Sequence, residues 1–180
     1  MSYSLDHFCI DVRAILQNGD DAPARGAIRQ TLEQLLRQEE FCAEYVGPDQ
    51  APGMREIYRD PDLHFCVLAY NMAEPRTSPP HDHGNSWAVY GQTAGYTDMT
   101  IWSAANQDSG AIDKVRTFRL DSGQAGLFDV GEIHSIQYAA GSKFVRITGV
   151  DMSVETRRVY DLETKTVREI EHVATGSPKS

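Results

Sequence analysis

Three of the six histidines lie in two short segments whose spacing suits a metal site. His81 and His83 stand two residues apart, and His134 follows 51 residues after His83. Residues i and i+2 of a β-strand point to the same face of a sheet and lie about 7 Å apart. Two imidazoles placed in this way, with a third from another strand, can each reach one cation at about 2 Å. The spacing therefore predicts that His81, His83 and His134 bind a single metal ion.

The chemistry of such a site would follow from its neutral ligands. Three imidazoles leave a divalent cation with its full charge and with open coordination positions, which favours anionic ligands such as a thiolate, an enolate or hydroxide. Glu132 precedes His134 by two residues and is an alternative carboxylate ligand, although Gly131-Glu-Ile favours a turn. Histidine ligands alone suit zinc, iron, nickel or copper, so these residues leave the metal open.

The elements that would position these histidines differ between the two parts of the chain. Apolar residues from Leu5 to Leu16 recur at helical spacing, Asn18-Gly19 predicts a helix end, and a second helical stripe runs from Ala24 to about Phe41. Ten short strands separated by turn residues are predicted after them, at 55–59, 63–71, 81–92, 96–103, 115–120, 124–128, 134–138, 143–150, 154–161 and 167–170. Many short strands of this kind predict a β-sandwich or a closed barrel.

Composition narrows the class of protein. The 180 residues carry a formal net charge of −9, which argues against binding to nucleic acid or to an anionic membrane surface. No apolar run is long enough to span a bilayer, and the first residues do not resemble a secretory signal. The three cysteines are far apart and predict buried thiols in a reducing compartment, so we expect a cytoplasmic protein.

The two histidine segments resemble the two motifs of the cupin superfamily. The first motif places His-x-His before an acidic residue and then a glycine, which correspond here to His81, His83, position 88 and Gly95. The second motif, which has Gly, Pro-x-Gly and His, is similar to Gly123, Gly131 and His134, with Asp129 in the proline position. The resemblance implies a mainly β fold, the double-stranded β-helix or jelly-roll barrel, and we expect the two N-terminal α-helices that the apolar spacing predicts to pack against it.

Position 88 of the first motif holds alanine, so the acidic ligand is absent. This departure resembles the cysteine dioxygenase family of thiol dioxygenases, whose barrel also follows a helical segment. The resemblance implies Fe(II) as cofactor, with zinc, nickel or manganese as alternatives, and a small thiol and O2 as substrates. The segment beginning at Arg55 is similar to the strand that carries the family's carboxylate-binding arginine, although Arg55 is offset by one residue. The family's Ser-x-His-x-Tyr relay corresponds here to Arg146, Thr148 and Val150.

These comparisons give a set of expected site residues. Arg55 or Arg146 is the expected partner of a substrate carboxylate, and an alternative places Arg146 in a surface ion pair. Thr148 joins them as a candidate catalytic residue. Ser86, Trp87 and Tyr90 are candidate lining residues of the substrate pocket.

The expected organisation is one structural domain with a helical segment at 1–46, a barrel at 54–172 and a disordered tail at 173–180. The expected function is oxidation of a small carboxylate-bearing thiol, of the cysteine or 3-mercaptopropionate type, to the sulfinate by a mononuclear non-haem iron dioxygenase. One alternative is a three-histidine cupin that cleaves a β-diketone or another enolisable substrate. A further alternative is a non-catalytic cupin that binds a metal or a small ligand. We expect a monomer or homodimer.

Overall fold

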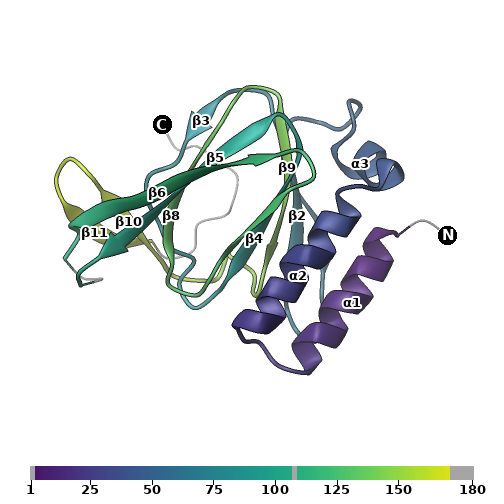
Figure 1. The fold of residues 1–180 in the computed structure, drawn as a ribbon, viewed down its shortest axis with the longest axis horizontal. Coiled ribbons are helices and arrows are strands. Elements are labelled where there is room, and N and C mark those ends of the chain that lie inside the picture. Colours follow the sequence, from purple (N-terminus) through teal and green to yellow (C-terminus); the bar gives the residue numbers. More distant parts are fainter. Residues whose placement is uncertain (1–2, 107–108, 171–180) are drawn as a thin grey trace.

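Three helices open the chain and eleven strands follow them in the computed structural model, which describes residues 3–106 and 109–170 (Figure 1). The helices are α1 (Leu5–Gln17), α2 (Ala22–Leu35) and α3 (Glu39–Val46). The strands are β1 (Gly53–Arg59), β2 (Cys66–Met72), β3 (Arg76–Thr77), β4 (Ala88–Ala94), β5 (Tyr96–Ala104), β6 (Ile112–Asp121), β7 (Ala125–Phe128), β8 (Ile133–Tyr138), β9 (Ser142–Thr148), β10 (Arg157–Asp161) and β11 (Thr166–Ile170). None of the described helices is long and apolar enough to cross a membrane.

The helical segment contains three helices rather than the two that the sequence predicts. α1 ends at the predicted position, with Asn18 as its C-cap. The second apolar stripe is divided because α2 ends at Leu35 and α3 begins at Glu39. Leu36 and Phe41 are both buried, yet in one continuous helix they would lie about 140° apart around the axis. The turn between α2 and α3 therefore allows both side chains to reach the core.

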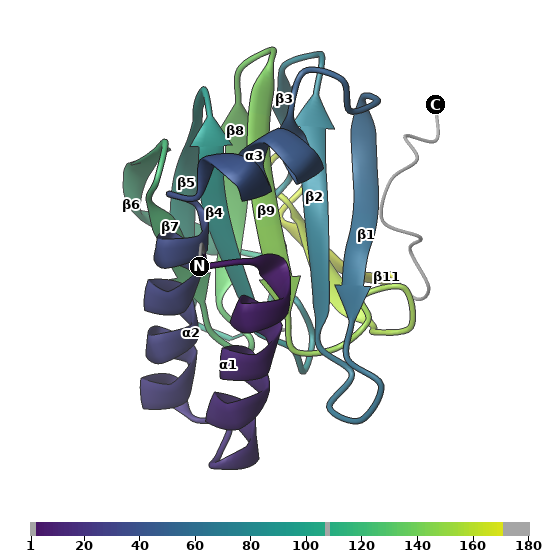
Figure 2. The ribbon, with the colours of Figure 1, turned by 90° about the vertical axis from the view of Figure 1, so that its right-hand side faces the viewer.

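The strands form two antiparallel sheets and a separate hairpin. The larger sheet has the order β1-β2-β9-β4-β7, the smaller has the order β3-β8-β5-β6, and β10 pairs with β11. Figure 2 shows α1, α2 and α3 in front of the larger sheet, with the smaller sheet behind it. This is the mainly β, double-stranded β-helix architecture that the sequence predicts, with helices covering its outer face.

Alternation along the central strands divides the apolar residues between two cores. Val145 and Ile147 of β9 pack with the helices, whereas Phe144 of the same strand packs between the two sheets. In β4, Val89 faces the helices and Tyr90 faces the interior. The larger sheet is thus buried on both faces, and even-numbered residues of β9 point into the space between the sheets.

The strand predicted at 81–92 is the prediction that differs most from the structure. β4 begins only at Ala88, and His81 forms isolated bridges to His134 and Val159. Residues 82–87 form an irregular loop, so the expected two-residue alternation does not place His81 and His83. The predicted tail at 173–180 lies outside the described residues.

Candidate metal centre

His81, His83 and His134 meet between the two sheets, as their spacing predicts. One ring nitrogen from each lies within 4.8 Å of the others, and all three residues are buried. The ring centroids of His81 and His134 are 4.6 Å apart, and those of His83 and His134 are 4.8 Å apart. Small rotations of the side chains from this arrangement would bring the three nitrogens to about 2 Å from one cation.

Long-range backbone contacts hold the loop that carries His81 and His83. The backbone N–H of His81 donates to the His134 carbonyl at 2.8 Å, and the reverse bond is 2.9 Å long. Beyond His81, the Asp82 carboxylate accepts a hydrogen bond from the Arg158 N–H at 2.8 Å. β8 and β10 therefore fix the two sides of the loop.

Gly84 allows this loop to approach the segment that leads into β10. Its φ is +61°, and a Cβ at this position would overlap the Thr156 carbonyl oxygen and the Glu155 carboxylate. The Glu155 carboxylate also accepts a hydrogen bond from the Asn85 N–H at 2.8 Å. Only glycine combines this backbone conformation with such a close approach.

Burial keeps all three imidazoles neutral at physiological pH. Desolvation lowers the pKa of His81 from 6.5 to about 4, although a hydrogen bond to the backbone of Pro79 partly opposes the shift. Desolvation also holds the pKa values of His83 and His134 well below the ordinary value. Metal ions bind the neutral form of histidine, so the burial of the rings favours this form.

The unpaired ring nitrogens fit a bound cation. Nδ1 of His81 lies 2.9 Å from the Pro79 carbonyl oxygen, which fixes the proton on Nδ1 and leaves Nε2 as the donor atom. Nδ1 of His83 and both ring nitrogens of His134 are buried without a hydrogen-bond partner. Buried polar atoms rarely lack partners, and a metal ion would satisfy those that face the cluster.

The described residues bring no carboxylate into this cluster. Ala88 is fully buried where the first motif would have its acidic residue. Glu132, the alternative ligand, accepts a hydrogen bond from the Asp129 N–H at 3.0 Å and closes its own turn. The donor set is therefore three neutral nitrogens.

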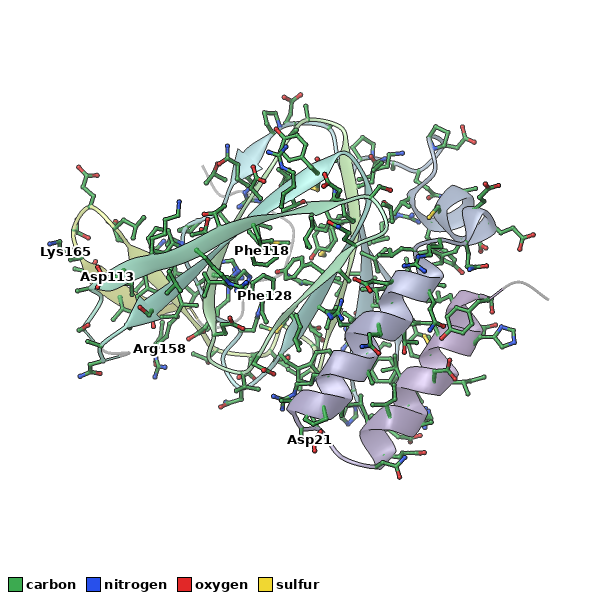
Figure 3. All side chains as sticks on the ribbon, viewed as in Figure 1. Asp21, Asp113, Phe118, Phe128, Arg158 and Lys165 are labelled. Atoms are coloured by element: carbon green, nitrogen blue, oxygen red, sulfur yellow. The ribbon has the colours of Figure 1, made fainter. Side chains whose placement is uncertain are left out.

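Aromatic side chains surround the histidines on the interior side. Phe128, labelled in Figure 3, stacks on His134 with ring centroids 4.0 Å apart. The Tyr90 hydroxyl lies 3.2 Å from Nε2 of His83. The site thus has apolar walls and one hydroxyl group next to a ligand ring.

The two candidate arginines lie on opposite faces of the larger sheet. Arg55 points toward the helices and donates to the Tyr45 carbonyl at 2.6 Å. Arg146 points between the sheets, is 5% exposed, and lies over the rings of Tyr70 and Tyr90 at 5.4 and 5.9 Å. Of the two, only Arg146 approaches the histidine cluster, through Tyr90.

The other expected site residues are divided in the same way. Tyr90 and Thr148 face the interior, and the Thr148 hydroxyl donates to the Val150 carbonyl at 2.8 Å. Trp87 belongs to the core beneath the helices, and its indole N–H donates to Asp20 at 3.2 Å. The Ser86 hydroxyl donates to the backbone of Trp87 within the loop. The structure therefore does not bring Trp87 to the histidines.

Two residues of this interior, Tyr70 and Arg157, are not among those that the sequence predicts. Tyr70 of β2 is partly buried against the interior core and its ring lies under Arg146; desolvation raises the pKa of Tyr70 to about 12. Arg157 opens β10, two residues before Val159, which bridges to His81. The alternation of β2 could have indicated Tyr70, but no local signal indicates that β10 lies beside the histidine loop.

A cavity of about 200 Å³ opens beside Arg146, between β1, β2 and the segment that follows β9. Arg59, Glu56 and Asp151 contribute its charged lining. Arg59 forms ion pairs with both carboxylates. The cavity gives Arg146 access to small molecules from this side.

Comparison with known proteins supplies only structural similarity, since no family model and no curated protein matches the sequence. A protein with a double-stranded β-helix domain from Klebsiella pneumoniae is 13% identical, has a TM-score of 0.46, and aligns over 69% of this chain and 96% of its own. The Schizosaccharomyces pombe Cnp3 cupin domain is 12% identical, has a TM-score of 0.42, and aligns over 54% of this chain and 60% of its own. KdgF from Halomonas sp. is also 12% identical, with a TM-score of 0.42 and coverage of 53% and 74%.

The fold and the histidine cluster together define the class of protein. The chain is a mainly β protein of the double-stranded β-helix architecture, in which a buried three-histidine group can hold a metal ion.

Proposed function

We propose that this protein is a mononuclear non-haem iron dioxygenase that oxidises a small acidic thiol to its sulfinate. Thiols that carry a carboxylate, of the cysteine or 3-mercaptopropionate type, are the first substrates to examine. The observation that carries the proposal is a cluster of three neutral histidines, without a carboxylate, close to the buried guanidinium of Arg146.

The donor set supports an anionic ligand at the metal. Three neutral imidazoles leave Fe(II) with a charge of +2, and a thiolate is an anion that such an ion binds well. Bound iron would supply Lewis acidity toward the sulfur and the redox chemistry that O2 requires. The net reaction adds both atoms of O2 to the sulfur and converts a thiol into a sulfinic acid, so it needs no other oxidant.

The chain's own residues would bind and orient the substrate. Nε and Nη2 of Arg146 lie on one edge of the guanidinium and have no partner, an arrangement that suits both oxygens of a carboxylate. The Tyr90 hydroxyl lies next to His83 and is placed to donate a hydrogen bond to an oxygen near the metal. Phe128 and the surrounding apolar residues would exclude water from a sulfur bound at the cluster.

Arg146 also separates the proposal from its first rival. A β-diketone or another enolisable substrate would bind through its enolate oxygens and would leave the buried guanidinium without a partner. Burying an unpaired charge is costly, so Arg146 favours a substrate with an additional acidic group.

The test is an assay of oxygen consumption on protein whose metal content is known. Metal analysis would follow anaerobic reconstitution with Fe(II) and, separately, with zinc, nickel or manganese. An oxygen electrode would then compare cysteine, 3-mercaptopropionate and acetylacetone, with mass spectrometry to detect a product heavier by two oxygen atoms. We expect a thiol-dependent rate with iron alone.

Two variants control this assay. His81→Gln should lose both the metal and the rate, whereas His64→Gln, which changes an exposed histidine, should retain both. An iron-loaded protein that consumes O2 with the diketone and not with thiols would refute the proposal. Consumption with none of the three compounds would favour a non-catalytic protein.

A further inference from the structure

Two arginines, the buried Arg146 and the half-buried Arg157, carry positive charges that no carboxylate of the described residues pairs with. Nε and Nη2 of Arg146, and Nε of Arg157, are buried and have no hydrogen-bond partner. Within residues 3–106 and 109–170, no carboxylate forms an ion pair with either arginine. Unpaired buried charge is strongly unfavourable, so these two groups indicate a ligand rather than a structural role.

The two guanidinium groups belong to the same interior region as the histidines. Arg146 lies over Tyr70 and Tyr90, and Tyr90 contacts His83. Arg157 stands two residues before Val159, the bridge partner of His81.

The two carboxylates that line the cavity beside Arg146 are already paired. Glu56 and Asp151 line the cavity that reaches Arg146, but both form ion pairs with Arg59. A bound divalent cation would add two more positive charges beside the two arginines. The interior would then hold four positive charges, and a ligand with a single carboxylate and a thiolate would balance only two of them.

The unpartnered N–H groups of the two arginines would also need more acceptor oxygens than one carboxylate provides. The Nε and Nη2 edge of Arg146 can bind both oxygens of a carboxylate side by side. The unpartnered Nε of Arg157 comes from a different strand and requires a further acceptor. A tetrahedral phosphate-type group, or a second carboxylate, supplies that acceptor together with the missing charge.

We propose that Arg146 and Arg157 form a subsite for a doubly charged acidic group on the molecule that meets the histidine cluster. The group is a phosphate or phosphonate, or a pair of carboxylates; both are doubly charged oxyanions. This subsite extends the proposed function by describing the acidic end of the substrate. It rests on the proposed function only for the other end, the group that binds the metal.

The test measures anion binding to metal-free protein, so it depends on neither iron nor O2. Calorimetric titrations at about pH 8, where inorganic phosphate carries close to two charges, would compare phosphate, malonate and acetate. Histidine side chains are neutral at this pH, which lies well above their ordinary pKa of about 6.5. We expect phosphate or malonate to bind at least about tenfold more tightly than acetate, a difference of about 1.4 kcal/mol. Tighter binding of phosphate would identify a phosphoryl-type group, and tighter binding of malonate would identify a dicarboxylate.

Three variants connect the binding to the subsite. Arg146→Gln and Arg157→Gln should each weaken binding of the doubly charged anion by at least about tenfold. Arg116→Gln, which removes an exposed arginine of β6, should leave it unchanged. Should Arg146→Gln fail to fold, the half-buried Arg157 still provides the test.

The proposal is overturned if acetate binds as tightly as phosphate and malonate, or if Arg157→Gln has no effect. Oxygen consumption is measured separately on iron-loaded protein. If the protein binds doubly charged anions at this subsite but oxidises no thiol, the dioxygenase assignment is refuted and the subsite is not.

Discussion

Acidification from about pH 6.5 to about pH 4 should destabilise the metal-free protein. An unfolded histidine has a pKa of about 6.5, whereas burial lowers the pKa of His81 to about 4. Between these values the unfolded chain binds a proton that the folded protein does not, so the free energy of unfolding falls as the pH falls. Above about pH 6.5 the histidine is neutral in both states and contributes no pH dependence.

The magnitude follows from the same values. Each histidine of this kind lowers the free energy of unfolding by up to about 1.4 kcal/mol per pH unit, and His81 alone accounts for at most about 3 kcal/mol as the pH falls through the range. When His83 and His134 are included, the free energy of unfolding falls by at most about 4 kcal/mol per pH unit. Because domains are stable by only about 5–15 kcal/mol, the metal-free protein should unfold before the pH reaches about 4.

Urea unfolding in the presence of a chelator, followed by circular dichroism at several pH values, measures this slope. His81→Gln should reduce it by about 1.4 kcal/mol per pH unit, while His64→Asn, at an exposed position, serves as the matched control. Titrating carboxylates contribute equally to all three proteins and cancel in the comparison. Identical slopes for wild type and His81→Gln would show that the ring is not held neutral inside the fold.

Three further predictions concern the same interior. Zinc at about one hundred times its Kd should stabilise the wild type by about 2.7 kcal/mol in thermal unfolding, and His134→Gln should abolish this shift; a shift that survives would place the metal elsewhere. Gly84→Ala should cost at least about 2 kcal/mol in chemical unfolding and weaken zinc binding, because a Cβ meets the Thr156 carbonyl. Gly141 also has a positive φ, but a Cβ there would meet open space, so Gly141→Ala should lower the free energy of unfolding by less. Equal losses for the two variants would contradict the close approach of Gly84 to Thr156. Arg146→Met should raise the melting temperature of the ligand-free protein by about 2–4 °C, or about 1 kcal/mol, because it removes an unpaired buried charge; a lower melting temperature would mean that the charge is compensated.

The sequence predicted the features that depend on local pattern. The mainly β architecture, the first helix end at Asn18 and the convergence of three histidines are all confirmed. The histidines converge for a reason other than the one given, since His81 and His83 do not lie on a regular strand. Their positions come from pairing with β8 and β10, which strand alternation alone does not describe.

The features that the sequence could not predict depend on contacts between distant segments. The alternation of β4 and β9 determines which side chains face the histidines, and it places Trp87 under the helices. Arg157 comes close to the histidine loop because β10 hydrogen-bonds to Asp82, 76 residues earlier in the sequence. No periodic pattern indicates a pairing over this separation.

The arrangement of the two cores explains how the fold tolerates so much polar chemistry in its interior. The apolar residues of α1 and α2 bury the outer face of the larger sheet, and this burial stabilises the fold independently of the space between the sheets. The inner face can therefore hold three neutral imidazoles and the unpaired guanidinium of Arg146, at a cost that the outer core offsets. Because an anion near the arginines and a cation at the histidines attract each other, each should increase the affinity of the other by the same factor. Ligand and metal are thus coupled through charge alone, and the interior should reach its most stable state only when both are bound.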